Sequence, residues 1–304
     1  MTRRCAVGSA AWLSGLLAAA GCAGAPDTPA PARDRTALVE LGRQHATAWE
    51  LYQALEREAG GGQHPAVDRL PDWSGVYSRA RGGITFDPDQ PPDGLPTATL
   101  TPEYHGRMLK RIEMAKQGIE WDPISTCAPP GHPRWLTEPF LREFVVTPDQ
   151  TWLINEMVND IRRIYTDGRG HVPEVDRYPL YNGDSVGFWD GDRLVIHTNQ
   201  LQAGIYQRRN PDYTDQVETV EIWQKVGEDL IEVDVWVYDP PALAEPWYTK
   251  QAYAKLSDPD RSLRVRYWHC GENDNNAVVQ TVEGATQFRD FTFTDGDNDR
   301  GGAQ

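Results

Sequence analysis

The feature that most constrains this chain is a long series of short runs, from Arg142 onward, in which apolar and polar residues alternate. Alternation with a period of two is typical of β-strands that bury one face. Turn-forming residues separate the runs, as in Trp189-Asp190-Gly191-Asp192, where Asp-Gly is a strong hairpin signal. The candidate strands are 142–147, 151–157, 161–166, 184–189, 193–198, 217–226, 229–238, 246–254 and 262–269.

The connections between these runs lack the crossover helices that parallel strands usually require. The sequence therefore predicts a mainly β fold, an antiparallel up-and-down barrel in which about eight strands leave room for one small ligand. Two N-terminal helices are expected: one over residues 36–59, before a triple glycine, and one that begins after Thr101. We expect one domain over residues 36–290 and a disordered tail over 291–304.

Residues 1–22 have the pattern of an export signal. Arg3 and Arg4 precede an apolar stretch that is too short to span a bilayer, and a run of small residues then ends at Cys22. The pattern resembles a bacterial lipoprotein signal, which implies a lipidated Cys22, a tether over 23–35 and a periplasmic protein anchored to the outer membrane. Cleavage as an ordinary secretory peptide is the alternative.

The chain has a net charge of −15, which becomes −17 without the two arginines of the signal. We therefore expect neither nucleic acid nor an anionic membrane surface as a partner, and membrane contact only through a lipid anchor. The 11 Trp, 12 Tyr and 7 Phe residues suit a β-rich core. They also suit a pocket for a small hydrophobic or aromatic molecule.

Outside the signal, the sequence contains two cysteines, Cys127 and Cys270. One disulfide is the simplest expectation for an exported protein, and a catalytic thiol with a spare cysteine is the alternative. The sequence has no CxxC pair and no signature of a serine nucleophile, a nucleotide site or a helical zinc site. No cofactor is expected, although His132, His171, His197 and His269 could converge on a metal ion in space.

The first candidate site surrounds a tight turn and contains Tyr165, Asp167, Arg169 and His171. Residues two apart on a strand share a face, so an uninterrupted strand would place all four together. Gly168 favours a turn instead, in which Asp167 accepts backbone hydrogen bonds and Arg169 forms an ion pair. In the functional interpretation, His171 is a general acid or base that a carboxylate orients.

The second candidate is His197, which shares a strand face with Val195 and lies opposite Leu194. If the Leu194 face packs against the helices, His197 points into the barrel. Nearby, Asp190 and Asp192 flank Gly191 and are most simply turn residues, while Trp189 is an aromatic candidate for holding a ligand.

Two further groups combine carboxylates with aromatic rings. Glu232 and Asp234 alternate along one strand face with Trp236 and Tyr238, either as an acid/base pair in a pocket or as a solvated face with arginine partners. His269 and Glu272 flank Cys270, and Trp268 would supply an aromatic wall.

Several stretches together resemble a large family of exported bacterial proteins, mostly without assigned function. They are residues 72–77 (DWSGVY), 127–134 (CAPPGHPR), 163–171 (RIYTDGRGH), 184–195 (DSVGFWDGDRLV) and 269–273 (HCGEN). The resemblance covers nearly the whole mature chain and implies a lipocalin-type β-barrel. In the family's pattern, Asp usually stands at the position of His197, and His commonly stands at the position of Asp184. The resemblance implies export and fold, but no reaction.

These observations predict an enzyme: a lyase, isomerase or hydratase that applies acid/base catalysis to a small aromatic or polycyclic molecule inside the barrel. His171 or His197 would move the proton, Asp167 or Glu272 would orient it, and Arg169 would stabilise a developing anion. The residues expected to bind the substrate are aromatic: Tyr165, Trp189, Trp236, Tyr238 and Trp268. The alternatives are a carrier of an apolar aromatic ligand and a structural or assembly factor of the cell envelope.

Overall fold

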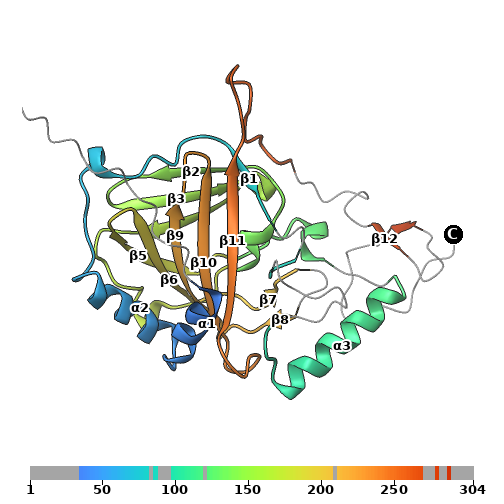
Figure 1. Ribbon diagram of the computed structural model, residues 1–304. Helices are drawn as coiled ribbons and strands as arrows, with labels where there is room; N and C mark the ends of the chain where they lie inside the picture. The colour runs from blue at the N-terminus through green and yellow to red at the C-terminus, as the bar shows by residue number, and fades with distance from the viewer. Residues whose placement is uncertain are drawn as a thin grey trace, which may run out of the picture. The chain divides into compact units, whose positions relative to one another are not determined.

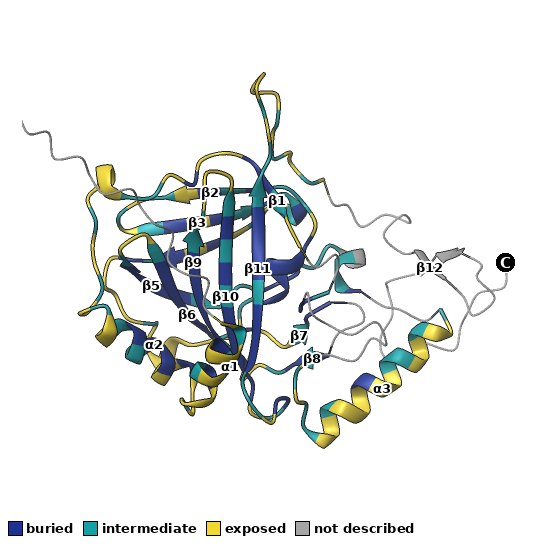
Figure 2. Cartoon of the chain, in the orientation of Figure 1, coloured by how far each residue is buried: buried dark blue, intermediate teal, exposed yellow. Residues whose placement is uncertain are grey.

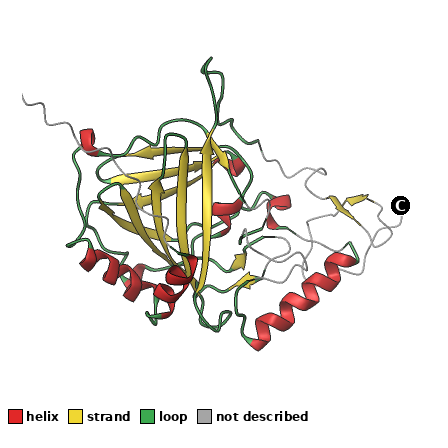
Figure 3. Cartoon of the chain, viewed as in Figure 1, coloured by secondary structure: helices red, strands yellow, loops and turns green. Residues whose placement is uncertain are grey.

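Nine strands close into a barrel, in the order β1-β11-β10-β9-β6-β5-β4-β3-β2 (Figure 1). The mainly β fold and the barrel are therefore confirmed, and strands dominate the described chain (Figure 3). The barrel strands are β1 (Tyr77–Arg79), β2 (Arg142–Val146), β3 (Gln150–Asn155), β4 (Asp160–Tyr165), β5 (Asp184–Asp190), β6 (Arg193–Asn199), β9 (Glu218–Lys225), β10 (Leu230–Tyr238) and β11 (Trp247–Lys255).

This computed structural model describes residues 34–81, 85–87, 97–118, 122–207, 211–269, 278–280 and 286–288. Residues 32–304 form one compact unit, to which every element described below belongs. The predicted signal, Cys22, Cys270, Glu272 and the predicted tail lie outside the described residues. Two small two-stranded sheets, β7 (Gly204–Ile205) with β8 (Asp212–Tyr213) and β12 (Val278–Gln280) with β13 (Thr286–Phe288), complete the strands.

The barrel differs from the predicted antiparallel meander at one pair of neighbours. β4 and β5 run parallel, with Ile164 opposite Ser185 and Tyr165 opposite Val186, whereas the other neighbouring pairs are antiparallel. The segment 166–183 carries the chain back to the start of β5 as an irregular connection, so no crossover helix is needed. The expected strand over 262–269 does not form, and β1 closes the barrel between β2 and β11.

Three α-helices occur among the described residues: α1 (Arg35–Arg43), α2 (Ala48–Glu58) and α3 (Pro102–Lys116). The single helix expected over 36–59 was wrong, because Thr47 is extended and its hydroxyl accepts a hydrogen bond from the backbone N–H of Glu50 (3.1 Å), which starts a new helix. None of the described helices is long and apolar enough to cross a membrane.

The helices α1 and α2 pack against the outer face of the barrel. α2 contacts β6, β9 and β10, and α1 contacts β11. Figure 2 shows buried positions on α2, which are Ala48, Leu51, Tyr52 and Leu55. These residues recur at helical spacing, so one face of α2 meets the strands while the opposite face meets solvent.

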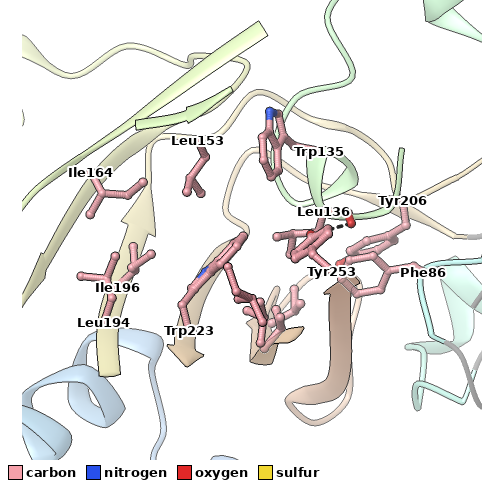
Figure 4. Packing of buried hydrophobic residues seen from close by; sticks show 14 of the residues in the cluster. Phe86, Trp135, Leu136, Leu153, Ile164, Leu194, Ile196, Tyr206, Trp223 and Tyr253 are labelled. Atoms are coloured by element: carbon pink, nitrogen blue, oxygen red, sulfur yellow. Dashed lines mark hydrogen bonds between the residues drawn. The ribbon is translucent and has the colours of Figure 1, made fainter. Parts of the chain in front are cut away.

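Apolar and aromatic side chains fill the barrel interior. Leu194 and Ile196 of β6 belong to this core (Figure 4), and the rings of Trp223 and Tyr253 stack at 5.4 Å. Because successive side chains of a strand point to opposite faces, His197 lies on the outer face of β6, beneath α2. The expectation that a ligand occupies the barrel and meets His197 there is therefore not supported.

A buried ion pair lies within this interior. Arg162 of β4 donates to both carboxylate oxygens of Glu221 on β9, at 2.6 and 3.0 Å, and also to Thr198 at 2.7 Å. His132 places Nε2 3.2 Å from Glu221 and 2.8 Å from the hydroxyl of Thr219. Burial lowers the pKa of His132 to about 4, with the Arg162 cation acting in the same direction. His132 is therefore neutral at pH 7.

The chain near His132 is also fixed covalently. Cys127 is disulfide-bonded, as expected, and its expected partner Cys270 lies outside the described residues. Cys127 ends a 3₁₀ turn, Pro123–Thr126, in a left-handed conformation with φ of 63°.

Replacing Arg162 with Ala should lower the free energy of unfolding by roughly 3–5 kcal/mol, because Glu221 would stay buried without its cation. Urea denaturation measures the loss. Arg193→Ala is the control, since it breaks a partly exposed pair with Asp190 and should cost at most about 1 kcal/mol. Equal losses in the two variants would contradict this account.

The neutral state of His132 should make stability depend on pH. The unfolded chain binds a proton at this imidazole below pH ~6.5, and the folded chain only near pH 4, so stability falls as the pH falls through that window. Between pH 7 and pH 5, the free energy of unfolding of the unchanged protein should fall by about 2 kcal/mol more than that of the His132→Gln variant. Urea denaturation at the two pH values measures both. The lowered pKa of His197 also makes stability fall as the pH falls, and Asp160, whose pKa is raised to about 6, has the opposite effect on stability. Both groups remain in the variant, so their effects cancel in the comparison. Parallel pH profiles would contradict a neutral His132.

Candidate active site

The two histidines singled out from the sequence meet on the outer face of the barrel. Nε2 of His171 lies 2.7 Å from Nδ1 of His197, and the two ring centroids are 4.9 Å apart. His197 comes from β6, and His171 comes from the connection between β4 and β5. The side chain of His171 is 7% exposed and that of His197 is 1% exposed, so this contact is largely shielded from water.

A carboxylate lies at each end of the histidine pair. Oδ2 of Asp184, the first residue of β5, is 2.8 Å from Nδ1 of His171 and accepts a hydrogen bond from the N–H of Val172 at 3.0 Å. At the other end, Oε2 of Glu218 is 3.3 Å from Nε2 of His197. We call Asp184, His171, His197 and Glu218 the relay.

The relay needs one more proton than two neutral imidazoles supply. Its three contacts each require a proton, and with both carboxylates ionised the two neutral rings offer only two N–H groups. The 2.7 and 2.8 Å contacts are the shorter and more buried, so the protons belong on Nδ1 of both rings. Nε2 of His197 is then an unprotonated nitrogen that faces Glu218, and a third proton there would complete the array.

The surroundings of the relay shift two of its pKa values. Burial lowers the pKa of His197, while the hydrogen bond and charge of Glu218 oppose that effect. Burial disfavours the carboxylate of Asp184, but hydrogen bonds from His171 and from the Val172 N–H outweigh it, so the pKa of Asp184 is lowered. The relay therefore combines a fixed carboxylate with an imidazole that favours its neutral, basic form.

Aromatic side chains of α2 cover the relay. The ring of Trp49 meets His171 at 5.6 Å and His197 at 5.0 Å, both edge to face. Tyr52, one helical turn further on, stacks on Trp49 at 5.2 Å and contacts His197 at 5.7 Å. Docking of α2 thus keeps water from both imidazoles.

A pocket of about 380 Å³ lies beside the aromatic cover of the relay, and none of the four relay residues is among its described lining residues. Trp49, Tyr52 and Glu56 of α2 form one wall, and Val186 to Phe188 of β5 form another. Its rim consists of residues 61–64, Asp149 and 166–170. Trp49 and Tyr52 therefore belong both to the pocket and to the cover of the histidine pair, and the volume suits a small molecule.

Asp167 and Arg169 lie at the pocket rim and bind each other. Nε of Arg169 donates to both carboxylate oxygens of Asp167 at 2.9 Å, and the guanidinium lies 4.2 Å from the ring centre of Tyr165. The N–H of Arg169 also donates to Asp167, at 3.2 Å. The turn-stabilising interpretation therefore describes their contacts, and neither side chain touches His171 in the contacts of the described residues.

The other predicted ligand-binding aromatics lie away from the relay. Trp189 is fully buried in the barrel core against Trp73. Trp236 and Tyr238 donate hydrogen bonds to backbone carbonyls of α1, at 2.7 and 2.8 Å, so they fasten that helix to β10. Trp268 packs edge to face on Phe140, and its backbone pairs with Asn159.

The carboxylates expected beside Trp236 are also engaged elsewhere. Glu232 pairs with Lys250 at 2.5 Å, and Asp234 accepts a hydrogen bond from the hydroxyl of Tyr248 at 2.7 Å. Of the four histidines considered as metal ligands, His171 and His197 meet, His132 lies inside the barrel and His269 is exposed. Within the described part of the chain, no three His, Cys, Asp or Glu side chains are grouped so that they could hold a metal ion.

Sequence reasoning missed four participants of the site. The sequence marked Asp184 only as a departure from the family pattern, and it did not point to Trp49, Tyr52 or Glu218. The pairing of β5 with β6 places Asp184 opposite Asn199, which no local pattern reveals. The tyrosine three residues after Trp49 is a signal that could have marked this helix face.

A scan against protein-family models and a search of curated proteins both find no match for this chain. The resemblance to exported lipocalin-type proteins therefore stays a prediction.

The geometry predicts how His197 titrates. Glu218→Gln should lower the pKa of His197 further, because the variant loses the negative charge that favours the imidazolium. NMR titration of the imidazole C–H signals measures the change. Glu228→Gln removes the same charge from an exposed turn and should leave the pKa unchanged. A rise in Glu218→Gln would contradict the relay.

Proposed function

We propose that this protein is an enzyme that applies acid/base catalysis to a small aromatic or polycyclic molecule, as a lyase, isomerase or hydratase. The observation that carries the proposal is the 2.7 Å contact between His171 and His197 with a carboxylate at each end. Paired imidazoles held by carboxylates are suited to moving protons near neutral pH. The proposed substrate site is the pocket beneath α2, rather than the barrel interior.

In this proposal, Nε2 of His197 accepts a proton and the resulting imidazolium completes the hydrogen bond to Glu218. Asp184 accepts the hydrogen bond from Nδ1–H of His171. Nε2 of His171 therefore stays unprotonated and accepts the hydrogen bond from Nδ1–H of His197 throughout. Glu218, 35% exposed, passes the proton between the buried pair and the outside. Trp49 and Tyr52 line the pocket and cover the pair, so they lie between the ring of the substrate and the two imidazoles.

The second candidate is a carrier that binds the same ligand without converting it. The near-complete burial of both imidazoles favours this alternative, because a ligand in the pocket meets Trp49 before it meets either nitrogen. In a carrier, the relay would only fasten the 166–183 connection to β6.

Export, lipidation of Cys22 and membership of the lipocalin-type family also remain proposals. The signal pattern supports the first two, and the closed barrel with its largely sequential strand order supports the third.

The mature protein should convert or exchange protons of a compound in a panel of aromatic metabolites. Incubation in D₂O with mass spectrometry detects lyases and hydratases by their products, and isomerases by deuterium uptake. His171→Gln and His197→Gln should each reduce the rate by roughly 10²–10⁴-fold, the range of general acid/base catalysis. His105→Gln, an exposed change on α3, should leave the rate unchanged. Binding without turnover, or full activity in both relay variants, would favour the carrier.

A further inference from the structure

We propose that the pocket rejects a ring that carries a carboxylate and accepts a hydroxyl-bearing ring, with Glu56 and Asp149 as the charge filter. This inference rests on the proposed function in one respect, because the same pocket would hold the substrate. It adds the charge class of the ligand and two residues that determine it.

The charged groups around the pocket are unbalanced. Among the described lining residues, Arg169 is the only lysine or arginine, against the carboxylates of Glu56, Asp149 and Asp167. Three negative charges less one positive charge leave an excess of two while His64 is neutral. A carboxylated ligand entering this pocket would meet net repulsion.

The positive charge of Arg169 is already engaged. Both carboxylate oxygens of Asp167 accept hydrogen bonds from Nε of Arg169, and Oδ2 also accepts one from Nη2 at 2.5 Å. The guanidinium lies over the ring of Tyr165. The side-chain hydrogen bond and charge of Asp167 raise the pKa of Arg169, and Asp149 acts in the same direction. A carboxylate of a ligand would have to displace Asp167 to use this arginine.

Glu56 and Asp149 lack such a partner. Within the described residues, no lysine or arginine lies at ion-pair distance from either carboxylate, and Asp149 has only His64, at 3.4 Å. Glu56 projects from the same face of α2 as Tyr52, and its charge helps to raise the pKa of the Tyr52 phenol, behind the larger effect of burial. Its negative charge therefore acts on groups that line the pocket.

The polar groups around the pocket can also pair with a hydroxyl. Gln63 and His64 offer donors as well as acceptors, and Glu56 and Asp149 offer acceptors. A hydroxyl both donates and accepts, so it uses this mixture, and an ammonium group would in addition be attracted by the excess negative charge. Trp49, Tyr52 and Phe188 supply apolar surface for the ring itself.

Binding of matched ligands tests the filter without relying on turnover. The probes are 2-naphthol, 2-naphthoate and 2-(aminomethyl)naphthalene, and a methyl glucoside distinguishes an aromatic from a sugar ring. Titrations followed by tryptophan fluorescence or calorimetry use the mature protein at pH 8, where an ordinary imidazole is neutral. We expect 2-naphthol to bind about tenfold more tightly than 2-naphthoate, the effect of two carboxylates in a water-like dielectric.

The double variant Glu56→Gln/Asp149→Asn should reduce this preference to about twofold or less, and raising the salt from about 0.05 M to about 0.5 M should weaken it in the unchanged protein. Glu58→Gln, an exposed change on α2, should keep the full preference. We expect the amine to bind at least as tightly as the naphthol. The inference is overturned if the naphthoate binds as tightly as either of the other two naphthalenes, if the double variant keeps the preference, or if no probe binds. Selective binding without proton exchange in D₂O would leave the filter intact and refute the enzyme.

Discussion

The hydrogen bond between His171 and His197 is the interaction on which the candidate site depends. It joins the connection after β4 to the outer face of β6, and this connection leads into β5, which runs parallel to β4. Within segment 166–183, His171 lies beside Asp184 at the start of β5. The connection that departs from a simple meander is therefore also the one that supplies His171 to the relay.

Polar groups are arranged differently on the inner and the outer face of the barrel. Inside, Arg162 and Glu221 satisfy each other in a bidentate pair, and His132 stays neutral beside them, an arrangement that favours one rigid state. Outside, under α2, the relay is one proton short of complete. A buried array that gains a hydrogen bond when it takes up a proton is suited to acid/base work, while an ion pair whose hydrogen bonds are already made, such as that of Arg162 with Glu221, is suited to structure.

Much of the barrel was predictable, since period-two alternation and turn residues located the barrel strands β2 to β6 and β9 to β11 within a few residues. Which face of a strand points inward was not, because alternation defines two faces without saying which is buried in the barrel. That ambiguity misplaced His197 and, with it, Trp236 and Tyr238. Asp184 of β5 and His197 of β6 are the partners of the two nitrogens of His171.

The proton positions in the relay test the account most directly. ¹⁵N–¹H correlation spectra of the histidine rings at pH 8, assigned with His171→Gln and His197→Gln, report which nitrogen of each ring carries its proton. The account predicts protons on Nδ1 of both His171 and His197, with Nε2 of His197 unprotonated and able to accept. A proton on Nε2 of His197 in the neutral protein would break the array at its shortest contact and contradict the central claim.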